Sequence, residues 1–352
     1  MKTLILKTTE EDIQRAAEII KDGGLVSFPT ETVYGLGADA LNSDAVRKIY
    51  EAKGRPSDNP TIVHIADVSD LKNLTPEITS DMEKLAEAFW PGPLTMVVPR
   101  LPEVPNVTTG GLETVGVRIP LEDVARDLIR KSNRPIAAPS ANLSGSPSPT
   151  AWEHVKQDMD GRIDAIIAGG TCRHGIESTV VDMTGETPCV LRPGVITPEM
   201  IALVLGKEVG VDPALLALEE GVESAETPKA PGMKYKHYAP KARVTIYDGG
   251  CREGGDAQDY SDGDAQDSDG GAVRDAMQRD AAELERQGKK VVILDFDNEE
   301  DAARNLFAAL RKADDDGAEH ILIAAVSREG IGFAVMNRML KAAGYNVKHI
   351  GG

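Results

Sequence analysis

The sequence predicts an α/β protein with a twisted, open, mixed sheet packed by helices, followed by a smaller, Rossmann-like parallel α/β domain. The chain has 352 residues, more than one compact core usually holds, so two domains of unequal size are expected. Its composition of 41% hydrophobic but only 4% aromatic residues is typical of an interior of aliphatic side chains. Short strand-like runs also recur between segments of helical periodicity along most of the chain.

In the first part of the chain, capping residues mark where helices begin. Thr9 precedes a run of acidic residues, and Asn42 precedes a second helix that leads towards Lys53. Gly23 and Gly24 end the first of these helices. Strands are expected at 4–6, 25–28, 61–65, 94–98, 115–119, 136–138, 165–167 and 179–181, and further helices at 80–89, 122–131, 151–157 and 198–205.

After about Gly206 the periodicity weakens into sequence rich in Gly, Glu and Pro, which is expected to form a linker over 206–241. Alternating strands and helices then resume, a pattern typical of a parallel domain. Strands are expected there at 244–247, 291–294 and 321–324, and helices at 272–287, 300–313 and 333–343. The predicted organisation is a first domain over 1–205, a linker, and a second domain over 242–352.

The segment 248–271 is rich in Asp and Gly and has few apolar side chains that could anchor it. It is predicted to be a flexible acidic loop inside the second domain. Its aspartate spacing resembles that of a calcium loop, but the glutamate that closes such a loop is absent.

Charge and cysteine content exclude several classes of protein. A formal net charge of −18 argues against general coating of nucleic acid, so any RNA contact is expected to be weak and local. The widely spaced Cys172, Cys189 and Cys251 indicate neither a zinc site nor a disulfide framework. No apolar stretch approaches the ~20 residues needed to cross a bilayer, so a cytoplasmic protein without membrane contact is expected.

Three polar strings in the first domain predict a site for a phosphate-bearing ligand. Lys53 and Arg55 lie two residues apart in a loop and can bracket a triphosphate, although alone they would be interpreted as solvated side chains. Ser140 and Asn142 follow a buried strand, where short donors and free backbone amides can bind phosphate oxygens. The strings are Thr30-Glu-Thr-Val-Tyr-Gly-Leu-Gly, Lys53-Gly-Arg-Pro-Ser-Asp-Asn-Pro and Pro139-Ser-Ala-Asn-Leu-Ser-Gly.

Other chemical patterns are weak or missing. The glycines of Gly35-Leu-Gly37 are too far from a strand end for a dinucleotide fingerprint, and no P-loop string exists. His64 lies in an apolar strand, where a histidine is more often a core residue than a catalyst. Arg118, in another apolar strand, requires an anionic partner, which either a ligand carboxylate or a protein carboxylate could provide. No ordering of residues indicates a Ser-His-Asp triad or a protein-bound metal.

With these strings in order, the chain resembles the YrdC family in its two-domain form, the threonylcarbamoyl-AMP synthases. The resemblance covers nearly the whole chain and has several long, ordered strings. They include Phe28-Pro-Thr-Glu-Thr-Val-Tyr-Gly-Leu, Trp90-Pro-Gly-Pro-Leu-Thr, Pro139-Ser-Ala-Asn, Glu177-Ser-Thr-Val, Arg192-Pro-Gly, Pro231-Gly-Met-Lys-Tyr and Ala334-Val-Met-Asn-Arg.

The resemblance implies an enzyme that joins L-threonine, bicarbonate or CO2, and ATP into threonylcarbamoyl-adenylate and pyrophosphate, the first step towards threonylcarbamoyladenosine (t6A) in tRNA. Lys53 and Arg55 would be catalytic, and Mg²⁺ would be carried by ATP. Downstream tRNA threonylcarbamoyl-transfer machinery would be the partner. The implied ATP-binding residues are Arg55, Asn59, Thr114, Ser140, Asn142, Ser148, Arg192 and Tyr235, and the implied threonine-binding residues are Thr32, His64, Arg118, Ala138 and Ser178.

Two alternatives remain open from the sequence. The same cavity could accept the backbone of double-stranded RNA or tRNA, or it could bind nucleotide in a regulatory protein without catalysis. A further hypothesis is that the linker, through Tyr235 and His237, folds over the cavity as a lid that keeps a labile intermediate from water.

Overall fold

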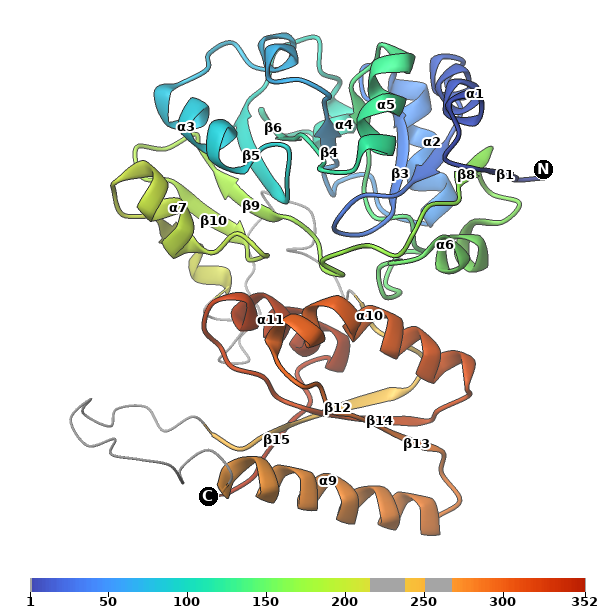
Figure 1. Cartoon of the computed structure of the whole chain (residues 1–352), viewed down its shortest axis with the longest axis vertical. Helices are drawn as coiled ribbons and strands as arrows, with labels where there is room; N and C mark the ends of the chain where they lie inside the picture. The colour runs from blue at the N-terminus through green and yellow to red at the C-terminus, as the bar shows by residue number, and fades with distance from the viewer. Residues whose placement is uncertain (1, 216–237, 251–267, 352) are drawn as a thin grey trace.

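The computed structural model describes residues 2–215, 238–250 and 268–351, which form two lobes built on one β-sheet each (Figure 1). The larger sheet belongs to the first lobe and the smaller one to the second. This confirms the predicted α/β class and its division into a larger and a smaller sheet. The predicted segment 248–271 lies mostly outside the described residues, and α9 begins inside it at Ser268.

The first sheet is mixed, as predicted, with neighbouring strands in the order β1-β8-β2-β3-β7-β4-β6-β5-β9-β10-β11. Parallel pairs such as β4–β6 occur beside antiparallel pairs such as β5–β6. The strands are β1 (Leu4–Leu6), β2 (Val26–Phe28), β3 (Gly35–Asp39), β4 (Ile62–His64), β5 (Leu94–Pro99), β6 (Thr114–Arg118), β7 (Ile136–Ala137), β8 (Ala165–Ile167), β9 (Thr179–Asp182), β10 (Cys189–Arg192) and β11 (Gly210–Val211).

The helices of this lobe begin where the capping residues predicted. The Thr9 side chain accepts a hydrogen bond from the Asp12 amide, and Asn42 accepts from two amides of the next helix. The helices are α1 (Glu10–Lys21), α2 (Ser43–Lys53), α3 (Ser80–Phe89), α4 (Asn106–Thr109), α5 (Asp123–Ser132), α6 (Trp152–Met159) and α7 (Pro198–Leu205), with a 3-10 helix η1 at Val68–Asn73.

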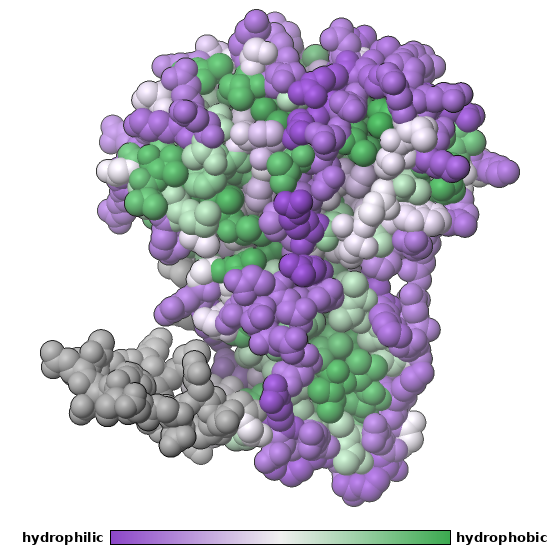
Figure 2. All heavy atoms as spheres, in the orientation of Figure 1, coloured by the Kyte–Doolittle hydropathy of each residue, from purple (hydrophilic) through white to green (hydrophobic). Residues whose placement is uncertain are grey.

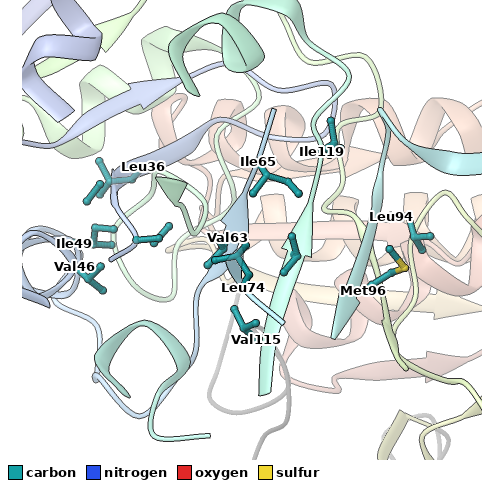
Figure 3. Close-up of a cluster of buried hydrophobic side chains, with 14 of the residues drawn as sticks. Leu36, Val46, Ile49, Val63, Ile65, Leu74, Leu94, Met96, Val115 and Ile119 are labelled. Carbon is teal, nitrogen blue, oxygen red and sulfur yellow. The ribbon is translucent and has the colours of Figure 1, made fainter. Parts of the chain in front are cut away.

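Helices cover both faces of the first sheet, and each face has its own core. On one face, Val46 and Ile49 of α2 pack towards Leu36 of β3 (Figure 3). On the other face, α1 and α5 pack on β2 and on Ile136 of β7. Ile136 and its neighbour Ala137 belong to the two different clusters, as alternation along a strand requires.

Strand β3 was not among the strands expected from the sequence. Its five residues are all buried, and it pairs antiparallel with β2 on one side and β7 on the other. Glycine is required at Gly37 because a Cβ atom there would lie 2.7 Å from Ile136 Cγ2. The glycines that superficially resemble a dinucleotide fingerprint therefore allow close packing within the sheet.

The second lobe has a parallel sheet in the order β13-β14-β12-β15, which confirms the predicted Rossmann-like arrangement. Helices α10 and α11 lie on the face towards the first lobe, and α9 covers the opposite face (Figure 1). The elements are β12 (Arg243–Asp248), α9 (Ser268–Arg286), β13 (Val291–Leu294), α10 (Glu299–Asp315), β14 (His320–Ala324), α11 (Ile331–Ala343) and β15 (Val347–His349).

Some elements were not expected from the sequence. Besides β3, they include α4, η1, β15 and the short β11, which lies inside the segment expected to be linker and pairs with β10. On the face shown in Figure 2, hydrophilic side chains predominate over the first lobe, and the apolar residues scattered among them include a patch over α7. Leu203 of that helix is 85% exposed. Within the described part of the chain, no helix combines the length and apolarity needed to span a membrane.

Candidate functional site

One cavity of the first lobe brings together residues from all three polar strings. It is lined by the turn between β2 and β3, the end of α2, strands β4 and β6, the loop after β7, and the hairpin of β9 and β10. Of the residues singled out from the sequence, it contains Thr32, Lys53, Arg55, His64, Arg118, Ala138, Ser140, Asn142, Ser178 and Arg192.

Lys53 is the last residue of α2, and Gly54 ends the helix in the left-handed conformation with φ of 61°. Its ammonium group donates to the backbone carbonyls of Ser140 at 2.5 Å and Asn142 at 2.6 Å. Burial lowers the pKa of Lys53 well below its usual value, and the positive charge of Arg55 adds to this effect. Lys53 is thus a buried cation that ties α2 to the Ser140 loop.

Arg55 is half-buried, and the pKa of its guanidinium is lowered chiefly by loss of solvation. Its Nη2 atom donates to the carbonyls of Asn59 at 3.1 Å and Pro60 at 3.0 Å, and the guanidinium lies 5.8 Å from the centre of the Tyr50 ring. Its Nε atom and both polar side-chain atoms of Asn59 are buried without a hydrogen-bond partner among the described residues. Unsatisfied buried donors and acceptors of this kind favour a ligand that completes them.

Arg118, at the end of β6, has the anionic partner that the sequence required. Its Nη2 atom lies 2.6 Å from Glu31 Oε1, and its Nη1 atom donates to the Thr32 hydroxyl at 3.0 Å. The partner is therefore a protein carboxylate. Thr32 and Arg118, joined by this hydrogen bond, both line the cavity.

His64, at the end of β4, is 3% exposed and lies edge-on to the ring of Phe28. Burial, with a contribution from the charge of Arg118, lowers the pKa of His64 to about 3. The imidazole is therefore neutral at pH 7. Its Nδ1 atom has no hydrogen-bond partner within the described structure, so it is available to a ligand in the cavity.

Ser178 and Arg192 lie at the adjoining ends of β9 and β10, which pair antiparallel. The Arg192 guanidinium donates to the carbonyl of Ser178 at 2.9 Å and to its hydroxyl at 3.1 Å. Burial lowers the pKa of Arg192 to about 10. The Ser178 hydroxyl also lies 2.8 Å from that of Thr95 on β5. Arg192 thus holds Ser178 at the cavity wall rather than extending into solvent.

Other predicted ATP-binding residues lie outside the cavity lining. Thr114 starts β6 and pairs with Pro99, at the opposite end of the strand from Arg118. The Ser148 hydroxyl donates to Glu177 at 2.6 Å, and the Asn59 carbonyl accepts from Arg55 at 3.1 Å. Tyr235 lies outside the described residues. The roles of these residues stay predictions.

Three residues of the site were missed by sequence reasoning. Glu31 lies within the Thr30 string, so the demand of Arg118 for an anion could have identified it. Glu177 lines the cavity beside Ser178, and its partners come from distant parts of the chain. Tyr238, in the expected linker, also lines the cavity and contacts Phe307 of α10 with ring centres 5.0 Å apart.

The linker returns to the cavity at its second end. The amide of Ala239 donates to the carbonyl of Gly145 at 2.8 Å, beside the Ser140 loop. Tyr238 has a positive φ of 64°, and burial, with the negative charge of Glu177, raises its pKa to about 12. The proposed lid residues Tyr235 and His237 lie outside the described residues.

Comparison with known proteins decides the family. A family model described as "Telomere recombination" matches residues 18–194, and one described as "Threonylcarbamoyl-AMP synthase, C-terminal domain" matches residues 196–344. The threonylcarbamoyl-AMP synthase of Pyrococcus abyssi is 46% identical over 361 residues, covering 98% of this chain and 99% of that protein. The chain belongs to the threonylcarbamoyl-AMP synthase family.

Further relatives of the same family agree with this assignment. The threonylcarbamoyl-AMP synthase of Bacillus subtilis is 45% identical over 345 residues, with 97% of this chain and 96% of that protein covered. The crystal structure of P. abyssi Sua5 complexed with L-threonine superposes with a TM-score of 0.89 at 45% identity, over 99% of this chain and 100% of that one. The family assigns the chain to the nucleotidyltransferase-type enzymes, so the resemblance stated from the sequence strings is confirmed.

Proposed function

We propose that this protein forms threonylcarbamoyl-adenylate and pyrophosphate from L-threonine, bicarbonate or CO2, and ATP, the first step of t6A modification of tRNA. The observation that carries this proposal is the family match along the whole chain. The proposal is supported by one cavity that is lined by all the predicted threonine-binding residues and by part of the predicted ATP-binding set, namely Arg55, Ser140, Asn142 and Arg192.

L-Threonine is assigned to the part of the cavity formed by Thr32, His64, Arg118, Ala138 and Ser178. The fixed guanidinium of Arg118 suits the substrate carboxylate, because charge-assisted hydrogen bonds are strong when water is excluded. The neutral His64 imidazole suits the hydroxyl, since its unpaired Nδ1 atom can accept or donate according to its tautomer. A ligand bound there has its amine directed towards the Lys53 side of the cavity in our proposal.

ATP is assigned to the part formed by Lys53, Arg55, Ser140, Asn142 and Arg192. Lys53 is buried and Arg55 is half-buried, so both can neutralise charge that develops on the phosphates with little further loss of solvation. Asn59, Thr114, Ser148 and Tyr235 complete the set that the family resemblance implies. The unpaired side-chain amide of Asn59 is consistent with a ligand contact.

The proposed chemistry balances without a general base from the protein. The threonine amine combines with bicarbonate to give a carbamate and water. A carbamate oxygen then attacks the α-phosphorus of ATP, forming the mixed anhydride while pyrophosphate leaves. Holding both substrates in line can provide much of the acceleration, and Lys53 and Arg55 stabilise the pentavalent transition state.

Mg²⁺ is assigned to the phosphates of ATP. Among the described residues, no group of three or more His, Cys, Asp or Glu side chains could hold a metal ion. The two carboxylates nearest the site, Glu31 and Glu177, are each paired with an arginine. The ion would add positive charge at the phosphates, and Lys53, Arg55 and Arg192 would position them.

The product is a reactive mixed anhydride, so a tRNA-dependent transferase must consume it downstream. Tyr238 and Ala239, where the linker meets the cavity, support the hypothesis that the linker shields this intermediate from water.

The decisive experiment is release of pyrophosphate from ATP by the purified full chain. Release is expected to require L-threonine and bicarbonate together, and omission of either should abolish it. Nucleotide binding without release would favour a regulatory protein, and RNA binding that weakens steeply with salt would favour an RNA-binding module.

A further inference from the structure

Arg338 of α11 reaches from the second lobe to the wall of the cavity. Its side chain is 0% exposed, and its Nε atom lies 3.2 Å from Glu177 Oε2. Its Nη1 atom donates to the carbonyl of Pro193 at 2.5 Å. Glu177 directly precedes Ser178, and Pro193 directly follows Arg192. One side chain of the second lobe thus holds both ends of the hairpin that presents Ser178 and Arg192 to the cavity.

Glu177 gives this contact its electrostatic importance. Among the described residues that line the cavity, it is the one carboxylate. Burial by itself would raise the pKa of Glu177, but the positive charges of Arg338 and Arg192 outweigh burial and hold the pKa below its usual value. A buried carboxylate repels a bound polyphosphate strongly, because the local dielectric constant is low. A cation beside it must offset that repulsion.

We propose that Arg338 is a positioning residue for nucleotide binding, which pairs with Glu177 and thereby offsets its negative charge and fixes the Ser178–Arg192 hairpin. The inference rests on the proposed function, since it assumes that the anionic ligand is ATP. It gives the second lobe a defined task in the chemistry of the first. Arg338 itself acts through Glu177 and Pro193 rather than by touching substrate.

A second ion pair between the lobes provides a matched control. Arg311 of α10 is 6% exposed and lies 2.7 Å from Asp158 of α6. It also donates to the carbonyl of Pro147 at 2.6 Å. Neither Asp158 nor Pro147 lines the cavity. Arg311→Met therefore removes a comparable buried pair between the lobes while leaving the Arg338–Glu177 contact in place.

The test measures ATP binding by calorimetry and KM for ATP, in the full chain, for Arg338→Met and Arg311→Met. Arg338→Met is expected to weaken ATP binding and raise KM about tenfold, with a smaller effect on KM for threonine. Arg311→Met is expected to change the ATP affinity and the KM for ATP by less than about twofold each. Thermal unfolding of the two variants shows whether loss of interlobe packing is comparable.

Recovery of ATP affinity by a second substitution distinguishes a role of the Arg338 charge from a merely structural role of its side chain. Glu177→Gln keeps an acceptor for Ser148 but removes the charge, so Glu177→Gln combined with Arg338→Met should recover most of the lost ATP affinity. In Arg338→Met alone, burial raises the pKa of Glu177, so its deficit in ATP affinity relative to wild type should narrow as the pH is lowered.

Equal loss of ATP affinity in Arg338→Met and Arg311→Met, or no recovery in the double variant, would overturn the positioning role. Failure of the wild-type chain to release pyrophosphate would refute the proposed function instead. In that case, unequal binding of ATP by the two variants would still support the Arg338 contact.

Discussion

Glu31 and Arg118 form an ion pair inside the first lobe, with Glu31 Oε1 2.6 Å from Arg118 Nη2 and side-chain exposures of 0% and 4%. The second carboxylate oxygen accepts from the Leu121 amide at 3.0 Å. The pair therefore fixes the turn after β2 against the end of β6. It also presents Arg118 to the cavity in one orientation.

Replacing Glu31 is expected to destabilise the fold. Glu31→Gln leaves the buried Arg118 guanidinium without a counter-charge, so the free energy of unfolding should fall by about 3 kcal/mol. Urea denaturation at pH 7 measures this difference. The control is Glu113→Gln, since Glu113 is 87% exposed in its pair with Arg100 and should contribute no more than about 0.5 kcal/mol. Equal effects of the two substitutions would contradict the argument.

His64 should make the fold sensitive to acid. Its folded-state pKa of about 3 is below the unfolded value of about 6.5, so the unfolded chain binds more protons between these limits. The contribution of His64 to stability is fully present above pH 6.5 and is lost as the pH falls towards 3, with a slope of up to about 1.4 kcal/mol per pH unit.

The measurement compares the free energy of unfolding of wild type and His64→Gln from pH 7 to pH 4. The difference between the two should shrink, or reverse, as the pH falls. His349→Gln removes a side chain that is 74% exposed and should follow the wild-type curve. Parallel curves for wild type and His64→Gln would contradict this prediction, because they would show that His64 binds its proton as readily in the folded chain as in the unfolded chain.

Lys53→Met should abolish most turnover while preserving stability. The ammonium group is proposed to neutralise the transition state, so kcat/KM for ATP should fall at least about 100-fold. Burial lowers the pKa of Lys53, and Met removes that desolvation penalty, which offsets the lost hydrogen bonds to the Ser140 loop. Lys48→Met, an exposed site on the same helix, is the control for pyrophosphate release. Full turnover in Lys53→Met would remove the phosphate role.

Gly175 should be intolerant of any side chain. It has φ of +74°, and a Cβ atom would lie 2.3 Å from the carbonyl of Arg304 in α10. Gly175→Ala is therefore expected to reduce the free energy of unfolding by about 2–4 kcal/mol by forcing the two lobes apart. Gly170→Ala, whose added Cβ has nothing within 4 Å, should be nearly neutral in the same denaturation assay. A neutral Gly175→Ala would mean that the lobes adjust freely at this contact.

The sequence allowed the cavity to be predicted because its polar strings lie at strand or helix ends, which a sheet brings together. The burial of Lys53 could not be predicted in this way. Its local sequence is that of an exposed loop, and its partner Ser140 lies 87 residues later. Burial of a long cation depends on which distant carbonyls meet it, and spacing along the chain carries little information about that.

Strand β3 and Glu177 show a second limit. The Gly35–Asp39 run lacks the residue types that are favoured in strands. It forms a strand nevertheless, because it pairs with β2 on one side and with β7 on the other. Glu177 could be assigned a charge from the sequence, but its partner Arg338 lies 161 residues further on, in another lobe. The resemblance to a family identified both strings, yet gave no indication that they meet.

The same 161-residue separation has a consequence during protein synthesis. A ribosome adds about 5–20 residues per second, so the emerging chain exposes Glu177 roughly ten seconds or more before Arg338 has been translated. Until then, Glu177 in the nascent first lobe lacks its ion pair with Arg338. The positioning contact proposed for Arg338 can therefore form only when translation of the polypeptide is almost complete.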